Sequence, residues 1–245
     1  MKYLFCLALM LLLSGDASKN VVFSTSYEKN ERTSDLEFDL PKAKDAVGRS
    51  GVVSRGGKYS IRHKIANSKE YISHNAHRAE STTMHHSASR YNEGDHFRYQ
   101  FSIYLPADWE VDSRDSIDIF WQFKRFDGGP DIFIAVKGTD IVLRSNGLNN
   151  RRQDALVKDY KAGRWYDFRF DILWSAGSEG QLRAFMKSGD EKEYVEVASF
   201  KGATAQRDTN NSTYLKWGVY KPDFDKSTVK NPRVIHHDQI SVMKL

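Results

Sequence analysis

Strand-like segments fill most of this sequence, and this feature limits the possible folds more than any other. Runs rich in β-branched and aromatic residues recur along the chain, separated by glycines and polar residues, and such runs favour strands. Helical periodicity is scarce, and only 41–47 is typical of a short helix. Many antiparallel strands at this spacing predict an all-β sandwich or jelly roll. The predicted strands span 21–27, 58–64, 97–104, 131–136, 141–144, 165–174, 181–187, 194–200, 214–220 and 234–244.

The first 17 residues have the features of a secretory signal peptide. Lys2 gives a positive start, residues 3–13 are apolar, and a cluster of small residues ends at Ala17. The apolar run is too short to span a membrane. Removing it also removes Cys6, the only cysteine, so the mature chain has no disulfide and depends on its core. We expect a secreted or periplasmic monomer with no membrane anchor, in which residues 18–245 form a single domain.

The charge balance favours an anionic partner. The chain has 37 Lys and Arg against 32 Asp and Glu, a formal net charge of +5, and a basic secreted protein attracts anions. It contains no compact basic run and no recognised nucleic-acid-binding motif. An acidic polysaccharide is therefore a better candidate than nucleic acid, although the same balance would also serve solubility alone.

The segment 214–221 alternates between two kinds of side chain. Read as a strand, it places Leu, Trp and Val on one face, which can pack on a core. The opposite face carries two phenols, one amine and a glycine, which would allow close approach of another group: Tyr214, Lys216, Gly218 and Tyr220. An amphipathic strand with a tyrosine-rich outer face is the simplest interpretation, and the wall of a polar groove is the alternative.

Two other strand-like stretches place polar pairs on a single face. Gln122 and Lys124 share a face with Phe120 in a mainly aromatic run, and Arg78 shares a face with Glu80. Each pair has an ordinary explanation, since Arg78 and Glu80 could form a cross-strand ion pair worth ~0.2–1 kcal/mol and Lys124 could extend its amine to solvent. The repetition of this pattern in three stretches favours the wall of a polar groove over an ordinary solvated strand face.

The order of these residues resembles the motifs of a known enzyme group. Arg78-x-Glu80, then Gln122-x-Lys124, then Tyr214-x-Lys216-x-Gly218-x-Tyr220 are similar to the motifs of the jelly-roll polysaccharide lyases, which include alginate, heparin, glucuronan and ulvan lyases. With supporting segments the resemblance covers 78–242. It implies a concanavalin-like jelly roll with a substrate groove on its concave sheet. It also implies β-elimination on an anionic, uronate-containing polysaccharide, giving unsaturated oligosaccharides.

The resemblance implies roles for individual residues. Arg78 and Gln122 would neutralise the uronate carboxylate, Lys124 would be the base and Tyr220 the acid; the reverse assignment or a scheme that uses tyrosine alone stays open. Many members have His where this chain has Lys124. This departure makes the chain more similar to the members that use lysine. It therefore favours ulvan or another glucuronate-containing chain as the substrate, with alginate as the alternative. The side chains expected to bind substrate are Lys216, Glu80, His77, Tyr214, Arg125 and Lys221.

Two other functions fit parts of the pattern. A retaining glycosidase on a similar sandwich needs two carboxylates across the scissile bond, and the strand around Asp118 supplies only one. A lectin-like module that holds an acidic glycan without cleaving it would also use aromatic and basic strands. Such a module has no need of Lys124 together with Tyr220, so the pair favours an enzyme.

We expect no metal or cofactor in catalysis. The spacing of His74 and His77 can suggest a metal site, but no second metal motif accompanies it. We therefore expect the loop histidines to be mostly solvated. A structural calcium is compatible with this fold class, with Asp238 or Glu28 as conceivable ligands.

Overall fold

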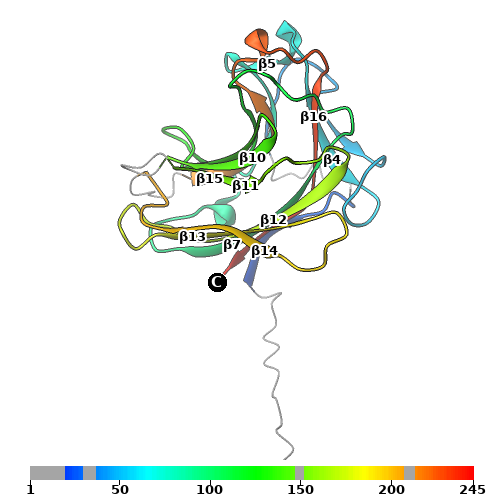
Figure 1. Ribbon diagram of the computed structural model, residues 1–245. Coiled ribbons are helices and arrows are strands. Elements are labelled where there is room, and N and C mark those ends of the chain that lie inside the picture. The colour runs from blue at the N-terminus through cyan, green and yellow to red at the C-terminus, as the bar shows by residue number, and fades with distance from the viewer. Residues whose placement is uncertain (1–19, 30–36, 147–151, 207–212) are drawn as a thin grey trace, which may run out of the picture.

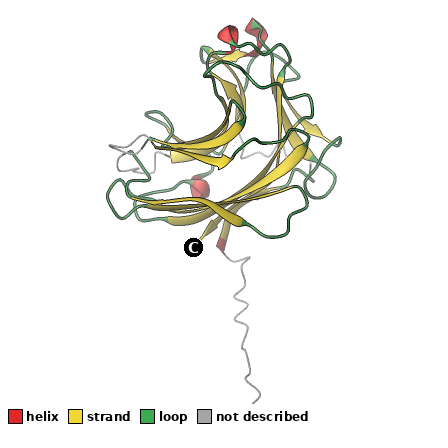
Figure 2. Cartoon of the chain, viewed as in Figure 1, coloured by secondary structure: helices red, strands yellow, loops and turns green. Residues whose placement is uncertain are grey.

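The protein is a sandwich of two antiparallel β-sheets, A and B, which lie face to face (Figures 1 and 2). The computed structural model describes residues 20–29, 37–146, 152–206 and 213–245; the expected signal peptide, 1–17, lies outside them. In the described part the helical elements are short 3-10 turns: η2 (Lys69–Tyr71), η3 (Ser87–Ser89) and η4 (Phe224–Lys226). The all-β jelly-roll prediction is confirmed.

Each sheet contains eight strands. In order across sheet A these are β14 (Val195–Lys201), β13 (Gln181–Ser188), β12 (Arg164–Leu173), β7 (His96–Leu105), β16 (Arg233–Lys244), β4 (Ser60–Ile65) and β3 (Val47–Ser50), with β1 (Val21–Thr25) also paired to β16. In order across sheet B they are β11 (Arg152–Val157), β10 (Asp140–Ser145), β9 (Ile132–Lys137), β8 (Asp118–Arg125), β15 (Thr213–Lys221), β6 (Ala76–Thr82) and β2 (Glu37–Asp39), with β5 (Ile72–Ser73) paired to β6.

The prediction of a short helix over 41–47 is wrong. Residues 43–46 form a turn, and β3 begins at Val47, opposite His63 of β4. Pairing with a neighbouring strand outweighs the weak local helical pattern. The hairpin predicted around residues 137–140 is present, because Lys137 of β9 pairs with Asp140 of β10.

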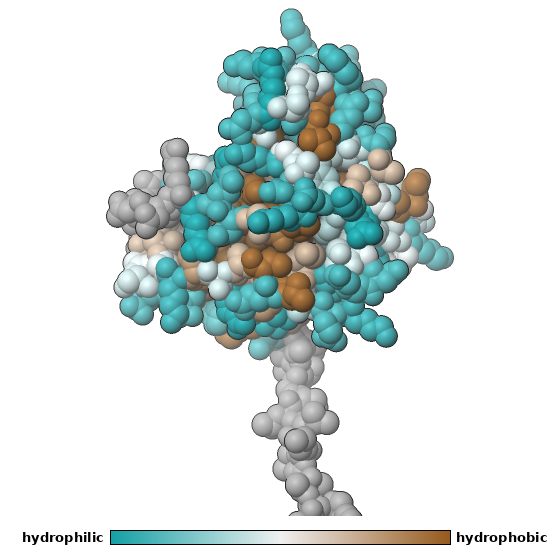
Figure 3. Space-filling model, viewed as in Figure 1, coloured by the Kyte–Doolittle hydropathy of each residue, from teal (hydrophilic) through white to brown (hydrophobic). Residues whose placement is uncertain are grey.

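Aromatic rings from both sheets fill the space between them. Trp121 of β8 stacks on Phe101 of β7 with ring centroids 3.9 Å apart, and it also stacks on Trp217 of β15 at 5.9 Å. Aromatic pairs add about 0.5–1.5 kcal/mol beyond the area that they bury. The visible surface is largely hydrophilic, with scattered apolar patches (Figure 3). Because Trp121 and Trp217 lie between the sheets, the inner faces of β8 and β15 belong to the core. Their outer faces are left for a site.

Irregularities in β8 and β15 change the predicted alternation of side chains. The pairing of β8 with β9 shifts between Ile119 and Trp121, and Phe120 and Trp121 both enter the core. Ile119 instead joins a small apolar cluster on the outer face, against which Tyr220 packs. The sequence therefore wrongly predicts that Phe120 shares the face of Gln122, because strict alternation does not survive a bulge.

Gly218 is required by the approach of a neighbouring strand. Its φ angle is 148°, and a Cβ atom there would meet the Ala79 carbonyl oxygen and would lie 2.7 Å from the Glu80 Cα atom of β6. The expected close approach therefore exists, but the approaching group is backbone.

We predict that Gly218→Ala lowers the free energy of unfolding by about 1–3 kcal/mol, because alanine is strained at this φ angle and collides with β6. Gly128→Ala is the matched control, since a Cβ atom there meets nothing within 4 Å. Urea unfolding of both variants measures the difference. Equal midpoints would contradict the role given to Gly218.

Buried histidines hold the two sheets together in neutral form. The ring of His63 lies edge-on to that of His237, with centroids 5.4 Å apart. His237 donates to the Phe120 carbonyl oxygen at 3.0 Å, and His63 Nε2 lies 2.8 Å from the Ser81 hydroxyl. Burial lowers the pKa of His237 to about 3 and that of His236 to about 4, and it holds the pKa of His63 well below its ordinary value.

These histidines predict a loss of stability in mild acid. Above pH ~6.5 they are neutral in both states, but below it only the unfolded chain takes up protons until the lowered native values are reached. Each such histidine costs up to about 1.4 kcal/mol per pH unit, so the three together cost up to roughly 4 kcal/mol per pH unit. Urea midpoints measured from pH ~7 to ~5 should fall steeply. A flat profile over this range would show that the histidines are protonated in the native state.

Candidate active site

A pocket of about 480 Å³ opens on the face of sheet B that is turned away from sheet A. Strands β2, β6, β8 and β15 all contribute to it, together with the turn between β5 and β6 and segments that flank the strands. Its lining consists mainly of charged and aromatic side chains: Asp39, His74, Arg78, Thr82, Met84, Lys124, Phe126, Tyr214 and Lys216.

A buried lysine forms the centre of the charge network beneath the pocket. Lys216 Nζ lies 2.9 Å from Asp39 Oδ2 and 2.8 Å from Glu80 Oε2, and the Gln122 amide donates to the other oxygen of Glu80. Burial alone would lower the pKa of Lys216, but the two carboxylates outweigh it and raise that pKa. Asp39 is half-buried, which would raise its pKa, yet its contacts with Ser73 and Lys216 hold that pKa well below the ordinary value.

Arg78 has weaker carboxylate contacts than Lys216. Its Nη1 atom is 3.4 Å from Asp39 Oδ2 and 3.8 Å from Glu80 Oε2. Its guanidinium lies over the ring of Tyr220, 4.2 Å from the centroid. Because these ion pairs are long, Arg78 can bind an incoming carboxylate at the pocket wall without first losing a strong partner.

Lys124 is the cation of the pocket that lacks a carboxylate partner. Its amine donates to the carbonyl oxygens of Gly128 and Arg125, and no carboxylate of the described residues lies within 4.0 Å of it. Burial lowers the pKa of Lys124, the charges of Lys216 and Arg78 act in the same direction, and those of Glu80 and Asp127 oppose them. A lysine with a lowered pKa is more readily neutral, as a general base must be.

Tyr214 lies directly opposite Lys124 in the pairing of β15 with β8. Its ring packs against Phe126 with centroids 4.9 Å apart, and burial raises the pKa of its hydroxyl. Tyr220 pairs with Ile119 instead, five residues from Lys124 along β8, or about 16 Å at the usual rise of a strand. Lys124 and Tyr220 therefore flank the Gln122–Lys216 pair from either side.

His74 and Asp39 are pocket residues that the sequence did not reveal. His74 has a positive φ of 47° in the turn between β5 and β6, and its Nδ1 atom lies 2.9 Å from Asp39 Oδ1. The His74 side chain is 77% exposed, as expected of a loop histidine, but it also lines the pocket. Asp39 belongs to a strand of only three residues, and its pairing with Glu80 in β6 brings it to the site.

Three residues predicted to bind substrate lie outside this pocket. His77 is buried against the Phe ring of η4, Arg125 is 2% exposed and lies 3.5 Å from Asp131, and Lys221 is 0% exposed and 2.9 Å from Asp112. All three occupy the alternate positions of their strands, which point away from the pocket. The structure gives each of the three a partner on that other side of its strand.

A sequence model of the polysaccharide lyase family, described as "Polysaccharide lyase", matches residues 14–241. The chain belongs to this family. It is a polysaccharide lyase, as the motif order predicts. No curated protein matches the sequence.

Solved structures with the same fold include enzymes of different chemistry. An endo-β-1,4-glucuronan lyase from Trichoderma reesei is similar at a TM-score of 0.64 and 16% identity, over 85% of this chain and 95% of its own. An alginate lyase from Aplysia kurodai gives 0.60 and 8%, over 92% and 99%. A β-glucanase catalytic domain from Podospora anserina gives 0.60 and 12%, over 90% of each chain. At these identities the likeness concerns the fold alone.

The carboxylates of this lyase are poorly suited to glycoside hydrolysis. Asp39 and Glu80 lie close together, but both bind the Lys216 ammonium. A glycosidase needs one carboxyl group whose pKa is raised so that it carries a proton, and Asp39 shows the opposite shift. Asp118 is bound through both oxygens by Arg233, at 3.1 and 2.6 Å.

Neither conceivable calcium ligand stands in a cluster of carboxylates. Glu28 Oε1 accepts the backbone N–H groups of Lys58 and Tyr59, and Asp238 Oδ2 accepts those of Arg55 and Gly56. The described residues contain no group of three or more His, Cys, Asp or Glu side chains that could hold a metal ion. Within the same residues, no helix has the length and apolarity needed to cross a membrane.

The two pocket lysines should differ in their effect on stability. Lys216→Met leaves the buried Glu80 and the half-buried Asp39 without their cation and should lower the free energy of unfolding by about 3–5 kcal/mol. Lys124→Met, the matched control, removes only bonds to carbonyl oxygens and should cost less than about 1.5 kcal/mol. Denaturant midpoints of the two variants test this, and a larger loss for Lys124→Met would reverse the roles.

Proposed function

We propose that this polysaccharide lyase cleaves a glucuronate-containing polysaccharide by β-elimination in the sheet B pocket. The observation that carries the proposal is Lys124. This half-buried amine has a lowered pKa and no carboxylate partner among the described residues. It lines the same pocket as the Arg78 guanidinium. Such an enzyme needs a base at the uronate C5 proton and a cationic group at the adjacent carboxylate.

Neutralisation of the substrate carboxylate makes the C5 proton removable, because the intermediate carries a second negative charge. Arg78 is suited to bind that carboxylate through its guanidinium, and Gln122 has a second N–H besides the one given to Glu80. The buried Lys216–Glu80 pair fixes the Gln122 amide. Charge that develops in the transition state is then met by donors already in place.

Proton transfer is assigned to Lys124 as base and Tyr220 as acid. Neutral Lys124 takes the C5 proton, the C4–C5 double bond forms as the C4–O bond breaks, and the Tyr220 hydroxyl protonates the departing oxygen. Tyr220 lies beside the pocket and outside its lining, with its ring under the Arg78 guanidinium. The lining itself offers Tyr214 opposite Lys124 and His74 bound to Asp39. Tyr214 is the alternative candidate for the acid, and His74 is the alternative candidate for the base.

Variants of these four residues would separate the assignments. Lys124→Met and Tyr220→Phe should each reduce kcat by at least ~100-fold, the size of a lost general acid or base, whereas Tyr214→Phe and His74→Asn should act mainly on KM. Turnover is read from the ultraviolet absorbance of the unsaturated product. Near-normal kcat in Lys124→Met together with loss in His74→Asn would transfer the base role to His74.

We also propose secretion through residues 1–17 and a preference for ulvan or glucuronan. Lys124 in the position often held by His resembles the ulvan-cleaving members, and the similar Trichoderma reesei structure is a glucuronan lyase. Alginate and heparin-like chains are the alternatives, because the pocket cations recognise carboxylate and sulfate alike.

A panel of ulvan, glucuronan, alginate and heparin would test the substrate class. The first two should be cleaved, and KM should rise with salt, because exposed ionic contacts are screened over about 8 Å at physiological ionic strength. Strong cleavage of alginate with none of ulvan or glucuronan would refute the preference. A KM that is indifferent to salt would contradict binding through the pocket cations.

A further inference from the structure

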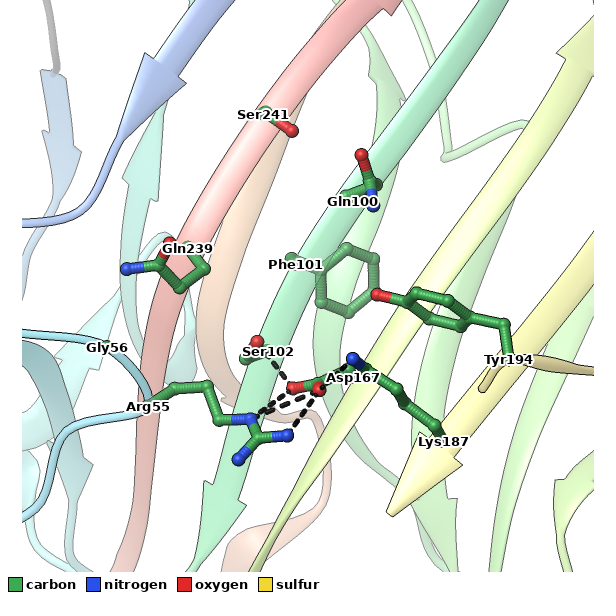
Figure 4. A pocket seen from close by; sticks show the side chains of 10 residues that line it. All are labelled: Arg55, Gly56, Gln100, Phe101, Ser102, Asp167, Lys187, Tyr194, Gln239 and Ser241. Atoms are coloured by element: carbon green, nitrogen blue, oxygen red, sulfur yellow. Dashed lines mark hydrogen bonds and ion pairs between the residues drawn. The ribbon is translucent and has the colours of Figure 1, made fainter. Parts of the chain in front are cut away.

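A second pocket, of about 410 Å³, lies on the outer face of sheet A, on the opposite side of the sandwich from the candidate active site (Figure 4). Gln100 and Ser102 of β7 and Asp167 of β12 form its floor. Arg55 projects into it from a loop on one side, and Tyr194, which precedes β14, closes the other (Figure 4). None of these residues takes part in the catalytic scheme.

The pocket holds one more cation than its carboxylate can neutralise. Asp167 accepts three bonds from Arg55, at 2.9, 3.1 and 2.7 Å, and one from the Ser102 hydroxyl at 2.7 Å. Lys187 Nζ lies farther away, 3.7 Å from the same carboxylate. Asp238 lies behind the lining, where its carboxylate accepts the backbone N–H groups of Arg55 and Gly56. The lining itself thus presents two cations, Arg55 and Lys187, against the single carboxylate of Asp167.

Neutral groups with the chemistry of sugar recognition surround this charge. Lys187 Nζ lies over the Tyr194 ring, 4.9 Å from its centroid, and the Tyr194 hydroxyl points into the pocket (Figure 4). Gln239 has a positive φ of 51° where the pairing of β16 with β7 shifts. The side chains of Gln239 and Ser241 line the pocket without a hydrogen bond to any other described residue.

We propose that this sheet A pocket binds an anionic sugar unit of the polysaccharide outside the active site. The carboxylate or sulfate would pair with Lys187 and Arg55, the ring would pack on Tyr194, and Gln239 and Ser241 would bond sugar hydroxyls. The choice of ligand rests on the proposed function, whereas the pocket itself does not. Because the two pockets face opposite ways, occupancy here tethers a long chain and raises its effective concentration without adding contacts at the cleavage point.

The test measures binding in a chain that does not degrade its ligand. In a Lys124→Met background, the further substitutions Lys187→Gln, Tyr194→Ala and Gln239→Ala are compared by affinity electrophoresis in gels containing glucuronan, ulvan, alginate or heparin. Lys201→Gln removes the same charge from an exposed position of β14 outside the pocket and is the matched control. Because no turnover is required, failure of the proposed reaction would not obscure the result.

We expect Lys187→Gln and Tyr194→Ala to weaken polymer binding roughly five- to tenfold, as the loss of one charged or stacking contact would, and Lys201→Gln to change it less than about twofold. In the active enzyme, turnover of short oligosaccharides should stay unchanged in all these variants. The exposed Gln239→Ala substitution keeps the test valid if Tyr194→Ala disturbs folding. Polymer binding equal to that of the control in Lys187→Gln and Gln239→Ala would overturn the proposal, as would a parent chain that binds none of glucuronan, ulvan, alginate and heparin.

Discussion

The candidate active site depends on one ammonium group buried between two carboxylates. Lys216 of β15 holds Asp39 of β2 and Glu80 of β6 at 2.9 and 2.8 Å, so it links three strands of sheet B beneath the pocket. Glu80 in turn orients Gln122, and Asp39 contacts Arg78 and His74. Once these charges are paired, Lys124 is left as the pocket amine without a carboxylate partner in the described structure, and burial lowers its pKa.

The strands that carry the site are held from behind by the core. Trp121 and Trp217 stack in the interior, while Gln122 and Lys216, one residue along each strand, take part in the polar network on the outer face. Bulges in β8 and β15 adjust this alternation, and Gly218 permits the close approach of β6. Packing on one face thus fixes the backbone from which the catalytic candidates project, as precise placement of such groups requires.

Periodicity predicts the sandwich and the face that each side chain shares, whereas the motif order of the family indicated which of these faces carries the site. Arg78, Lys124, Tyr214 and Lys216 line one pocket, with Gln122 and Glu80 beneath them. The same alternation places His77, Arg125 and Lys221 on the other face, although these residues were expected to bind substrate. Asp39 and His74 could not be found this way, since a three-residue strand and a tight turn carry no periodic signal and reach the site through tertiary pairing.

The central claim is that this pocket breaks a C4–O bond by elimination and not by hydrolysis. The most direct measurement is the mass of oligosaccharides released from glucuronan or ulvan in water enriched in oxygen-18. Elimination predicts that the new non-reducing end is one water molecule lighter than a hydrolysed end, and that cleavage itself incorporates no label. Saturated fragments in which the new non-reducing end keeps its O4 oxygen and the new reducing end carries the heavy oxygen would contradict the account.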